Sequence, residues 1–488
     1  MKNTTTGVIG AGIAGLAAAV RLASHGDSVQ VFEANAFPGG KLSQFQLGEY
    51  RFDAGPSLFT MPQYVDDLFR QAGEDPAEHF QYERLSVICH YFWEDGTRLQ
   101  AYADPDHFAQ EVHEKLGVPI RAIQQSLDDS RRKYELTGRI FLEKSLHRLD
   151  TWLDQRVLKS LLVLPTLDLF STLNRVNERH LKHPKLVQFF NRYATYNGSD
   201  PYKAPGLLSI IPHFEQHIGA YFPKGGMHAI TEAVYELARR KGVDFSFETP
   251  VKEVIVEQKR AIGLKTEGQT HRFDRIICNM DVFFAYDKLL PGQKQPKRIL
   301  NQKKSTSALI FYWGIRKVFP ELGLHNIFFS DNYREEFRHL AEGKVYEDPT
   351  VYINITSKCE AGDAPLEGEN WFTMINVPFI GGQDWDAIIA KARKDILAKL
   401  SRILGQEVEP LIEVESLLEP RSIESRTASH LGALYGTSSN NRMAAFMRHP
   451  NFSRRIRDLY FCGGSVHPGG GIPLCLLSAK IVDELIAG

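Results

Sequence analysis

The fold is decided by the stretch from Thr6 to Glu33, which reads T-G-V-I-G-A-G-I-A-G-L-A-A-A-V-R-L-A-S-H-G-D-S-V-Q-V-F-E. The apolar residues up to Ile9 predict a short buried strand, and the Ala- and Leu-rich run 16–23 predicts a helix. Residues 29–32 predict a second strand, which ends at an acidic residue. A strand, a glycine turn, a helix and a second strand in this order indicate a Rossmann-like α/β unit.

The glycines of this stretch form the pattern G-x-G-x-x-G, which is typical of dinucleotide binding. Gly10 permits the tight turn, Gly12 lets a diphosphate approach the backbone, and Gly15 lets the helix pack close to the strand. The start of that helix, around Ala14, offers N–H groups and a partial positive charge to phosphates. Glu33 lies eighteen residues after Gly15, where a carboxylate accepts bonds from ribose hydroxyls. An acid at this point favours NAD or FAD over NADP.

Length and composition limit the other functional classes. A chain of 488 residues is too long for one simple core, so two or three domains are expected. A net charge of -1 gives no reason to expect a nucleic-acid partner. The motif begins at residue 6, so no signal peptide is expected before it, and no apolar run is long enough to cross a membrane. The five cysteines are scattered, which predicts reduced thiols, a cytoplasmic protein and no metal site.

A second glycine pair follows the acid at once, in Pro38-Gly39-Gly40-Lys41, and then comes Asp53-Ala54-Gly55-Pro56-Ser57. A simple NAD dehydrogenase needs no such pair. The run from residue 6 to residue 57 resembles flavoproteins of the amine oxidase and carotenoid desaturase group, which have G-G-R or G-G-K followed by D-x-G. The resemblance implies FAD as cofactor, with Glu33 on the adenosine ribose and Lys41 near the phosphates. It also implies cofactor contacts at Gly40, Gly55, Pro56 and Ser57; the alternative for Lys41 is a solvated loop lysine.

The segment 220–281 resembles the return of the same group into its FAD domain. It contains P-K-G-G-M at residues 223–227, a predicted helix over 229–240, and predicted strands over 243–247, 251–256 and 272–279. The resemblance implies that the backbone of Val251 contacts the adenine. For Asn279 and Asp281, at the end of the last strand, turn chemistry is preferred to a catalytic role.

The segment 459–474, L-Y-F-C-G-G-S-V-H-P-G-G-G-I-P-L, is the most diagnostic part of the chain. It is similar to the carboxyl-terminal signature H-P-G-x-G-x-P of bacterial-type carotenoid desaturases of the phytoene desaturase family. The resemblance implies that Gly464, Ser465, Gly471 and Ile472 bind the flavin ring, with the following helix pointing its amino terminus at the pyrimidine. His467 is interpreted mainly as a structural turn residue.

The middle of the chain is read from its pattern alone. Residues 104–203 predict helices, and the apolar run 158–170 with basic neighbours suits either a bilayer interface or a core helix pair. Strands are predicted over 305–314, 349–356 and 371–377, followed by a helix over 385–404. The aromatic residues of these strands suit either a long apolar tunnel or plain core.

Together these features predict an α/β protein: a Rossmann-like FAD-binding domain, an inserted mixed-sheet substrate domain, and a helical region that acts as a lid or faces a membrane. The expected boundaries are 1–80, 215–290 and 425–488 for the FAD-binding domain, 81–104 and 291–424 for the substrate domain, and 105–214 for the helical region.

The resemblance implies FAD-dependent desaturation of a C40 carotenoid by removal of a hydride and a proton. The ending G-G-S-V-H-P-G-G-G-I-P-L favours C-3,4 desaturation of a hydroxylated or monocyclic intermediate. The alternatives are a phytoene desaturase, another flavin oxidoreductase acting on amines or retinoids, and a prenyl-binding escort that is not an enzyme. No catalytic residue is assigned. The expected electron acceptor is oxygen or a quinone, and the expected location is the inner face of the cell membrane, with peripheral attachment.

Overall fold

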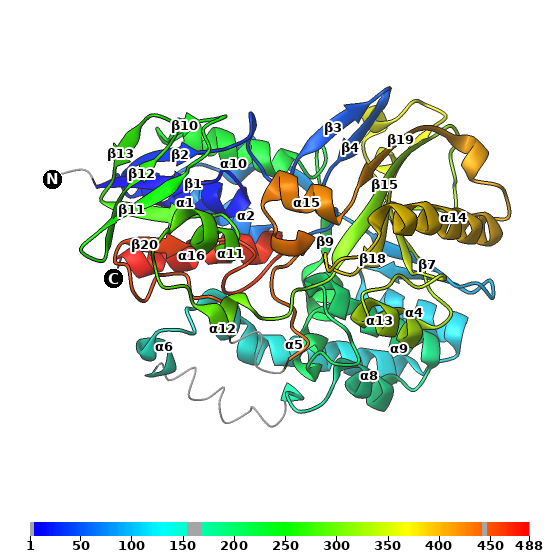
Figure 1. Cartoon of the computed structure of the whole chain (residues 1–488). Helices are drawn as coiled ribbons and strands as arrows, with labels where there is room; N and C mark the ends of the chain where they lie inside the picture. The colour runs from blue at the N-terminus through cyan, green and yellow to red at the C-terminus, as the bar shows by residue number, and fades with distance from the viewer. Residues whose placement is uncertain (1–3, 154–166, 442–446, 488) are drawn as a thin grey trace.

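A parallel sheet built from distant parts of the chain carries the amino-terminal glycine turn. The computed structural model describes residues 4–153, 167–441 and 447–487. Within them the sheet has five strands in the order β10-β2-β1-β14-β20, and every neighbouring pair is parallel (Figure 1). The strands are β1 (Thr5–Ile9), β2 (Ser28–Phe32), β10 (Asp244–Ser246), β14 (Arg275–Cys278) and β20 (Leu459–Phe461).

Both faces of this sheet are covered, as its continuous apolar strands require. On one face the Ala-rich helix α1 (Ile13–Ser24) packs along α16 (Ile472–Ala487), next to α2 (Gln63–Gln71) and α10 (Ala229–Arg240). The other face packs against residues of a three-stranded antiparallel sheet. The strands of that sheet are β11 (Glu253–Glu257), β12 (Arg260–Lys265) and β13 (Thr270–Arg272).

A second, mixed sheet lies on the other side of the molecule (Figure 1). In the described residues its order is β19-β15-β18-β17-β16-β7-β8, antiparallel except between β16 and β7. Helix α14 (Trp385–Leu404) covers one face. The strands are β7 (Val87–Phe92), β8 (Arg98–Tyr102), β15 (Ser307–Ile315), β16 (His325–Phe328), β17 (Val351–Ile355), β18 (Glu369–Val377) and β19 (Ile412–Leu418).

Two small sheets join the large ones. Strand β9 (Ala220–Pro223) pairs with both β5 (Phe59–Thr60) and β6 (Tyr82–Arg84). The hairpin of β3 (Gln44–Leu47) and β4 (Tyr50–Asp53) packs against the mixed sheet on the face opposite α14. These short strands, most of which follow the glycine pair Gly39-Gly40, therefore connect the parallel sheet to the mixed sheet.

Helices form a layer along the lower side of the view in Figure 1. The long helix α5 reaches from α4, beside the mixed sheet, to α16, beside the parallel sheet. This layer contains α4 (Pro105–Leu116), α5 (Ile120–Glu143), α6 (Leu149–Leu153), α8 (Leu173–Leu181) and α9 (Pro184–Asn191). The remaining α-helices described are α3 (Pro76–His79), α11 (Val282–Phe284), α12 (Lys297–Leu300), α13 (Tyr333–Ala341) and α15 (Pro420–Thr427).

In the middle of the chain the structure confirms predicted helices, whereas most of the apolar run lies outside the residues that it describes. The predicted helices 229–240 and 385–404 have the same bounds in the structure, as α10 and α14. Residues 158–166 of the apolar run lie outside the described residues; just after them Leu167 is buried and Phe170 is exposed. Among the residues that the structure describes, no helix is both long and apolar enough to cross a bilayer.

The aromatic residues of the mixed sheet are mainly core. Phe311, Trp313, Phe328 and Trp371 are fully buried in the cluster that includes α14. Tyr312 and Phe372 lie in a separate cluster, which faces β4. The first four therefore face α14, whereas Tyr312 and Phe372, together with Tyr352 on β17, lie on the hairpin side of the sheet.

Candidate functional site

The first glycine turn lies at the carboxyl end of β1 and leads directly into α1. Gly10 has a φ of 94°, which a residue with a side chain rarely adopts. A β-carbon on Gly15 would overlap the carbonyl oxygen of Gly10, so this position tolerates only glycine. Gly12 stands at the N-cap of α1 without a side-chain cap, and Ala14 lies buried in the first turn. The helix therefore presents backbone N–H groups at the sheet edge.

Glu33, at the carboxyl end of β2, is bound to the same turn. Its Oε2 accepts a hydrogen bond from the Ala11 amide at 2.7 Å, and its Oε1 accepts two from Asn35, at 2.9 Å and 2.8 Å. The carboxylate is 6% exposed. A carboxylate has about four acceptor positions, so capacity remains for hydroxyl donors. The acid is thus held in place beside the turn before any ligand binds.

The second glycine pair packs against the first turn. The Gly39 amide donates to the Ala11 carbonyl at 2.8 Å, and a β-carbon on Gly40 would lie 3.6 Å from the Cα of Gly12. A β-carbon on Gly55 would overlap the carbonyl oxygen of Lys41. Three segments, 10–15, 39–41 and 55, therefore approach one another at backbone distance, which explains their glycines.

Lys41 is not a solvated loop residue. Its Nζ donates to the carbonyl of Leu434 at 3.0 Å, which ties the second glycine pair to the segment 432–436. Burial lowers the pKa of this amine, and the nearby carboxylate of Asp281 acts in the opposite direction. Lys41 is therefore a partly buried cation at the junction of the amino- and carboxyl-terminal motifs.

Asn279 is the site residue that the sequence interpretation missed. With its amide oxygen turned toward α1, it accepts from the Gly12 and Gly15 amides, each at 3.3 Å. A β-carbon on Gly463, in the last glycine segment, would also meet this side chain. Asn279 follows β14, which lies between β1 and β20, so one side chain contacts both glycine motifs. The sequence signal for this role was the position of Asn279 at the end of a predicted strand.

Asp281, two residues later, has the turn role that was expected. It is the N-cap of α11, and its Oδ1 accepts from the Phe283 amide at 2.9 Å. In the neighbouring segment, Ser465 Oγ accepts from the Val282 amide at 3.0 Å. These bonds hold the segment that follows β14 against the segment that follows β20.

The carboxyl-terminal glycine segment closes the same edge of the sheet. Gly464 packs against Gly470, where a β-carbon would lie 3.2 Å from the Gly470 Cα. Gly471 has a φ of 109°, and a β-carbon there would meet nothing within 4 Å, so the space beside it is open. Ile472 begins α16 and is buried. The amino terminus of α16 thus opens onto free space, where a flat ring could approach the backbone.

His467 faces away from that open side. Its Nε2 donates to the carbonyl of Lys144, at the end of α5, at 2.9 Å, and its backbone amide donates to His449 O at 2.9 Å. Burial lowers the pKa of His467 to about 4. A neutral imidazole bonded to a carbonyl is a structural link, which agrees with the turn role expected for it.

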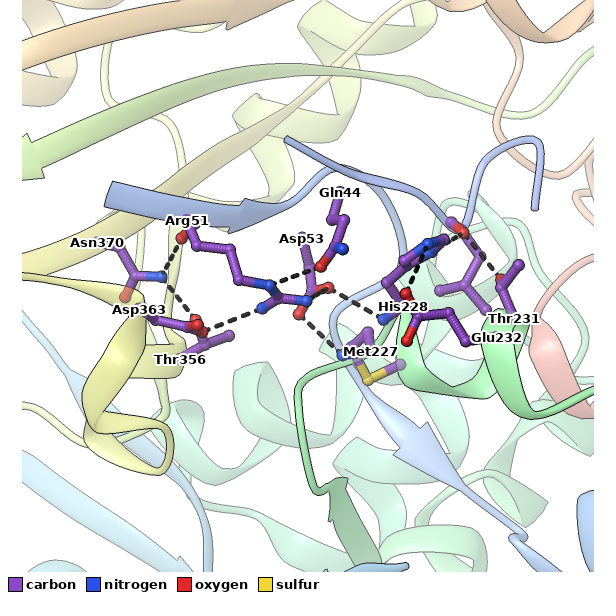
Figure 2. A network of polar contacts seen from close by, with 11 residues as sticks. Gln44, Arg51, Asp53, Met227, His228, Thr231, Glu232, Thr356, Asp363 and Asn370 are labelled. Carbon is purple, nitrogen blue, oxygen red and sulfur yellow. Dashed lines mark hydrogen bonds and ion pairs between the residues drawn. The ribbon is translucent and has the colours of Figure 1, made fainter. Parts of the chain in front are cut away.

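Asp53, the acid of the D-x-G motif, holds elements together (Figure 2). Its carboxylate accepts from the Met227 amide at 2.8 Å and the His228 amide at 3.0 Å, just before α10. It also pairs with Arg51 at 3.0 Å, and Arg51 pairs with Asp363 at 3.1 Å. A carboxylate at a helix amino terminus is favourable for the free N–H groups there.

The same network continues to the mixed sheet. Asn370, on β18, donates to the carbonyl of Arg51 at 2.7 Å and to Thr356 Oγ1 at 2.6 Å. On the other side, His228 and Thr231 both contact the carbonyl of Leu42 (Figure 2). The D-x-G and P-x-G-G-M motifs therefore bind each other, a pairing that sequence reasoning did not find.

The last three predicted positions lie around this edge. Ser57 follows Pro56 and makes a hydrogen bond with Tyr352 on β17, with the two hydroxyl oxygens 2.8 Å apart. Pro56 is partly buried. Val251 is buried in the cluster between the parallel sheet and the β11–β13 sheet, together with Phe32 at the end of β2. Val251 is thus near the Glu33 end of the site, whereas Ser57 is at the mixed-sheet end.

The arrangement fits a dinucleotide with a flat ring. A diphosphate needs backbone N–H groups and positive potential, which the start of α1 offers. A ribose needs a fixed acceptor, which Glu33 offers, and a ring needs backbone without side chains, as at Gly471. Because the crevice at the carboxyl ends of parallel strands is the usual ligand site in such sheets, these features point to one site.

Comparison with known proteins agrees with this geometry. The model of the family "Flavin containing amine oxidoreductase" matches residues 13–482. A 1-hydroxycarotenoid 3,4-desaturase of a Flavobacterium sp. is 52% identical over 480 residues, 98% of each chain. A 4,4'-diapolycopene oxygenase of a Methylomonas sp. is 32% identical, over 98% of this chain and 97% of its own. Among solved structures, putrescine oxidase bound to putrescine has a TM-score of 0.63 at 15% identity, over 100% of this chain and 99% of its own, which shows a shared fold.

Proposed function

The chain belongs to the flavin containing amine oxidoreductase family, and from this membership we propose that it is an FAD-dependent carotenoid desaturase. The observation that carries the proposal is the 52% identity, over nearly the whole of both chains, to a 1-hydroxycarotenoid 3,4-desaturase. The substrate class is therefore a C40 polyene with a hydroxyl group near one end. The reaction introduces a double bond at the 3,4 position. The expectation from the ending G-G-S-V-H-P-G-G-G-I-P-L agrees with that relative.

FAD is the cofactor, and the residues present fit it. The start of α1 holds the diphosphate: the helix amino terminus around Ala14 faces it, while Gly10, Gly12 and Gly15, whose amides are bound within the protein, leave room for its approach. Glu33 accepts from the adenosine ribose, since its carboxylate is fixed with acceptor capacity to spare. The remaining proposed contacts are Gly40, Lys41, Gly55, Pro56, Ser57, Val251, Gly464, Ser465, Gly471 and Ile472.

The bound flavin supplies the acceptor for the hydride that leaves an allylic carbon. The protein's own part is to bind and orient an apolar chain and to keep water out. The amino terminus of α16 would stabilise negative charge on a flavin bound there. Conjugation stabilises the positive charge that develops on the substrate, so no strong protein base is required. His467, bonded to the Lys144 carbonyl, is not used as one.

We also propose the domain division expected from the sequence. Residues 1–80, 215–290 and 425–488 form the FAD-binding domain, 81–104 and 291–424 the substrate domain, and 105–214 a helical lid. The strand order of the parallel sheet and the Asp53 network support the first of these.

A peripheral place on the inner face of the membrane is part of the proposal. The substrate dissolves in lipid, and Leu153 and Phe170, on either side of 154–166, are each 76% exposed. Charging both (Leu153→Asp with Phe170→Asp) is expected to weaken sedimentation with anionic liposomes. Leu366→Asp, at a side chain that is 97% exposed on a loop beside the mixed sheet, is the matched control. Equal binding of both variants contradicts the membrane-facing role. The terminal acceptor, oxygen or quinone, is identified by following flavin reoxidation with each.

The central experiment is incubation of the purified yellow protein with a 1-hydroxycarotenoid and, separately, with phytoene, followed by chromatography. The expected product is the 1-hydroxycarotenoid with one pair of hydrogen atoms fewer. Conversion of phytoene to lycopene would overturn the subtype in favour of a phytoene desaturase. Hydrogen peroxide formed with amines would indicate an amine oxidase. A colourless protein that binds prenyl chains without turnover would indicate an escort.

A further inference from the structure

A cluster of buried polar side chains lies where the mixed sheet meets the helical layer. We call it the polar seam, and it consists of Ser57, Arg192, Glu215, Gln216, His325 and Tyr352. These residues come from the Gly55 segment, the 3-10 helix η2 (Arg192–Asn197), the π-helix η4 (Phe214–Ile218) and the strands β16 and β17. All but Ser57 and Tyr352 are at least nine-tenths buried.

One half of the seam is a chain of hydrogen bonds that starts at the proposed flavin site. Ser57 Oγ lies 2.8 Å from the Tyr352 hydroxyl, which lies 2.8 Å from His325 Nδ1. Asn354 Nδ2 also approaches His325 Nδ1, at 3.2 Å. Ser57 follows Gly55 by two residues, so this half reaches from the D-x-G motif into the mixed sheet.

The other half is an ion pair enclosed by aromatic rings. Arg192 pairs with Glu215 at 3.4 Å, and the Tyr193 hydroxyl donates to Glu215 at 2.8 Å. The guanidinium lies over the rings of Tyr91, Tyr193 and Tyr196, at 5.4, 4.7 and 5.2 Å from their centroids. Tyr91 lies on β7, which pairs with β16, the strand that carries His325, so the two halves meet at these strands.

Several polar atoms of the seam lack a hydrogen-bond partner among the residues that the structure describes. They are both amide atoms of Gln216, Nε2 of His325 and Nε of Arg192, and the adjacent Tyr91 hydroxyl is in the same condition. Gln216 is 0% exposed, and its amide lies beside the Tyr193 hydroxyl. Because that hydroxyl donates its proton to Glu215, it can serve Gln216 only as an acceptor, so Oε1 of Gln216 remains without a donor. Each unsatisfied buried group costs about 1–3 kcal/mol.

Such a concentration of unsatisfied atoms inside an apolar core points to a ligand group that satisfies them. Around the seam the core is hydrophobic, with Leu58, Ile88, Phe189 and Ile211 in the same cluster. A π-helix, as at η4, is uncommon and occurs frequently at functional sites. The missing group must be small, uncharged and able both to donate and to accept, since Gln216 offers both roles.

We infer that the polar seam receives the hydroxyl group of the polyene substrate, with the Gln216 amide as the specificity-determining contact. This inference rests on the proposed function for the chemistry of the substrate. The hydroxyl donates to Oε1 of Gln216, while the apolar chain lies against the hydrophobic side chains that surround the seam.

The position of the seam agrees with the bond that reacts. In a 1-hydroxycarotenoid only C2 separates the hydroxyl-bearing carbon from C3. A group that binds this hydroxyl must therefore lie close to the proposed flavin site. Ser57, just after the D-x-G segment, bonds to Tyr352 of the seam, and the helix η4 that carries Gln216 packs against β5, which begins two residues after Ser57.

The test compares binding of a 1-hydroxycarotenoid with that of the same polyene lacking the hydroxyl group. Wild-type holoprotein in detergent is titrated with each, and quenching of tryptophan fluorescence gives the two dissociation constants. The wild type is expected to prefer the hydroxylated chain by roughly tenfold or more, because a site built for a hydroxyl rejects the analogue without it. In Gln216→Met, which keeps the length of the side chain, the preference is expected to fall to about one. Melting temperature is expected to stay level or rise, since a buried unsatisfied amide is removed.

Thr373→Val is the matched control. Thr373 is also fully buried with an unpartnered hydroxyl among the described residues, but it lies on β18 in line with Trp371, which faces α14. This variant is expected to keep the wild-type preference. If Gln216→Met is not recovered folded, Tyr352→Phe, which breaks the link between Ser57 and His325, serves instead and is expected to reduce the preference.

Equal affinities of the wild type for the two polyenes overturn the inference, as does a preference that survives in Gln216→Met. Turnover is measured in parallel and tests the proposed function separately. A wild type that prefers the hydroxylated polyene but forms no desaturated product contradicts the desaturase proposal and leaves the hydroxyl site supported.

Discussion

Asn279 and Gly15 are in contact: a β-carbon on Gly15 would lie 3.0 Å from the end of the Asn279 amide group, whose oxygen, turned toward α1, accepts from the Gly15 N–H. The contact joins the strand β14 to the helix that follows β1. Since Asn279 also lies against Gly463, it fixes the spacing between the two glycine motifs. The geometry of the cofactor site thus depends on a residue that contacts backbone on both sides.

Gly15→Ala is expected to destabilise the protein by about 1–3 kcal/mol or more, because the new methyl overlaps the Gly10 carbonyl and displaces α1. Thermal denaturation with and without added FAD measures the effect. Gly362→Ala is the control, since a β-carbon there meets nothing within 4 Å and the backbone is not strained. Equal melting temperatures for the two variants would contradict the steric argument.

Asn279→Leu is expected to weaken FAD binding by at least about tenfold, since it removes a hydrogen-bonding side chain that contacts both motifs. The ratio of flavin to protein after extensive dialysis measures the loss. Asn301→Leu, at an exposed residue just after α12, provides the comparison. Full flavin content in the Asn279 variant would show that the amide does not support the site.

Glu33→Gln is expected to lower affinity for FAD by about tenfold or more. The change keeps one acceptor for the Ala11 amide but replaces the other oxygen with a donor, which opposes Asn35 and a ribose hydroxyl. Titration of apoprotein with FAD, followed by flavin fluorescence, gives the constant. Glu232→Gln, at a carboxylate that is mostly exposed, should bind like the wild type. Unchanged affinity in Glu33→Gln would remove the proposed ribose contact.

Asp53→Ala is expected to reduce the free energy of unfolding by about 3 kcal/mol or more. It leaves the Met227 and His228 amides without their acceptor and Arg51 without one partner. Urea denaturation measures the loss. Asp67→Ala removes a solvent-exposed pair with Arg70 and should cost less than about 1 kcal/mol. Similar losses in both variants would show that the network in Figure 2 contributes little.

Acid should destabilise the protein partly through His467. Burial lowers its pKa in the folded state to about 4, whereas an unfolded histidine titrates near 6.5. Between these values the unfolded chain binds more protons, so the contribution is complete above about pH 6.5 and is lost as the pH falls toward 4. His467→Gln, which can still donate to the Lys144 carbonyl, is expected to flatten the dependence by up to about 1.4 kcal/mol per pH unit. Urea denaturation at several pH values measures it; equal slopes would contradict the assignment.

The fold could be predicted where a single segment carries its own signal. Helices 229–240 and 385–404 are long and periodic, so their bounds agree with α10 and α14. The strand–turn–helix–strand order at residues 5–32 follows from glycine stereochemistry and is present as expected. The family resemblance of the glycine motifs predicted the family to which the chain belongs.

The rest depends on contacts between distant segments, which no local pattern encodes. The D-x-G motif suggested no partner for its acid, yet Asp53 binds the backbone before α10. Asn279 looked like a turn residue because its partners, Gly12 and Gly463, are far away in the chain. The polar seam was equally invisible, since its members come from segments scattered between residues 57 and 352. Local propensity predicts elements, whereas these contacts arise only when the elements pack.

The parallel sheet also has a consequence for biosynthesis. Strand β1 pairs with β14, and β14 with β20, so the parallel sheet that carries the site is complete only after residues 459–461 have been translated. Until then β14 is an unprotected edge, and the nascent chain needs shielding from aggregation. Stable binding of the flavin is therefore expected only after β20 has joined the sheet, and a truncation upstream of β20 is expected to give a protein without flavin.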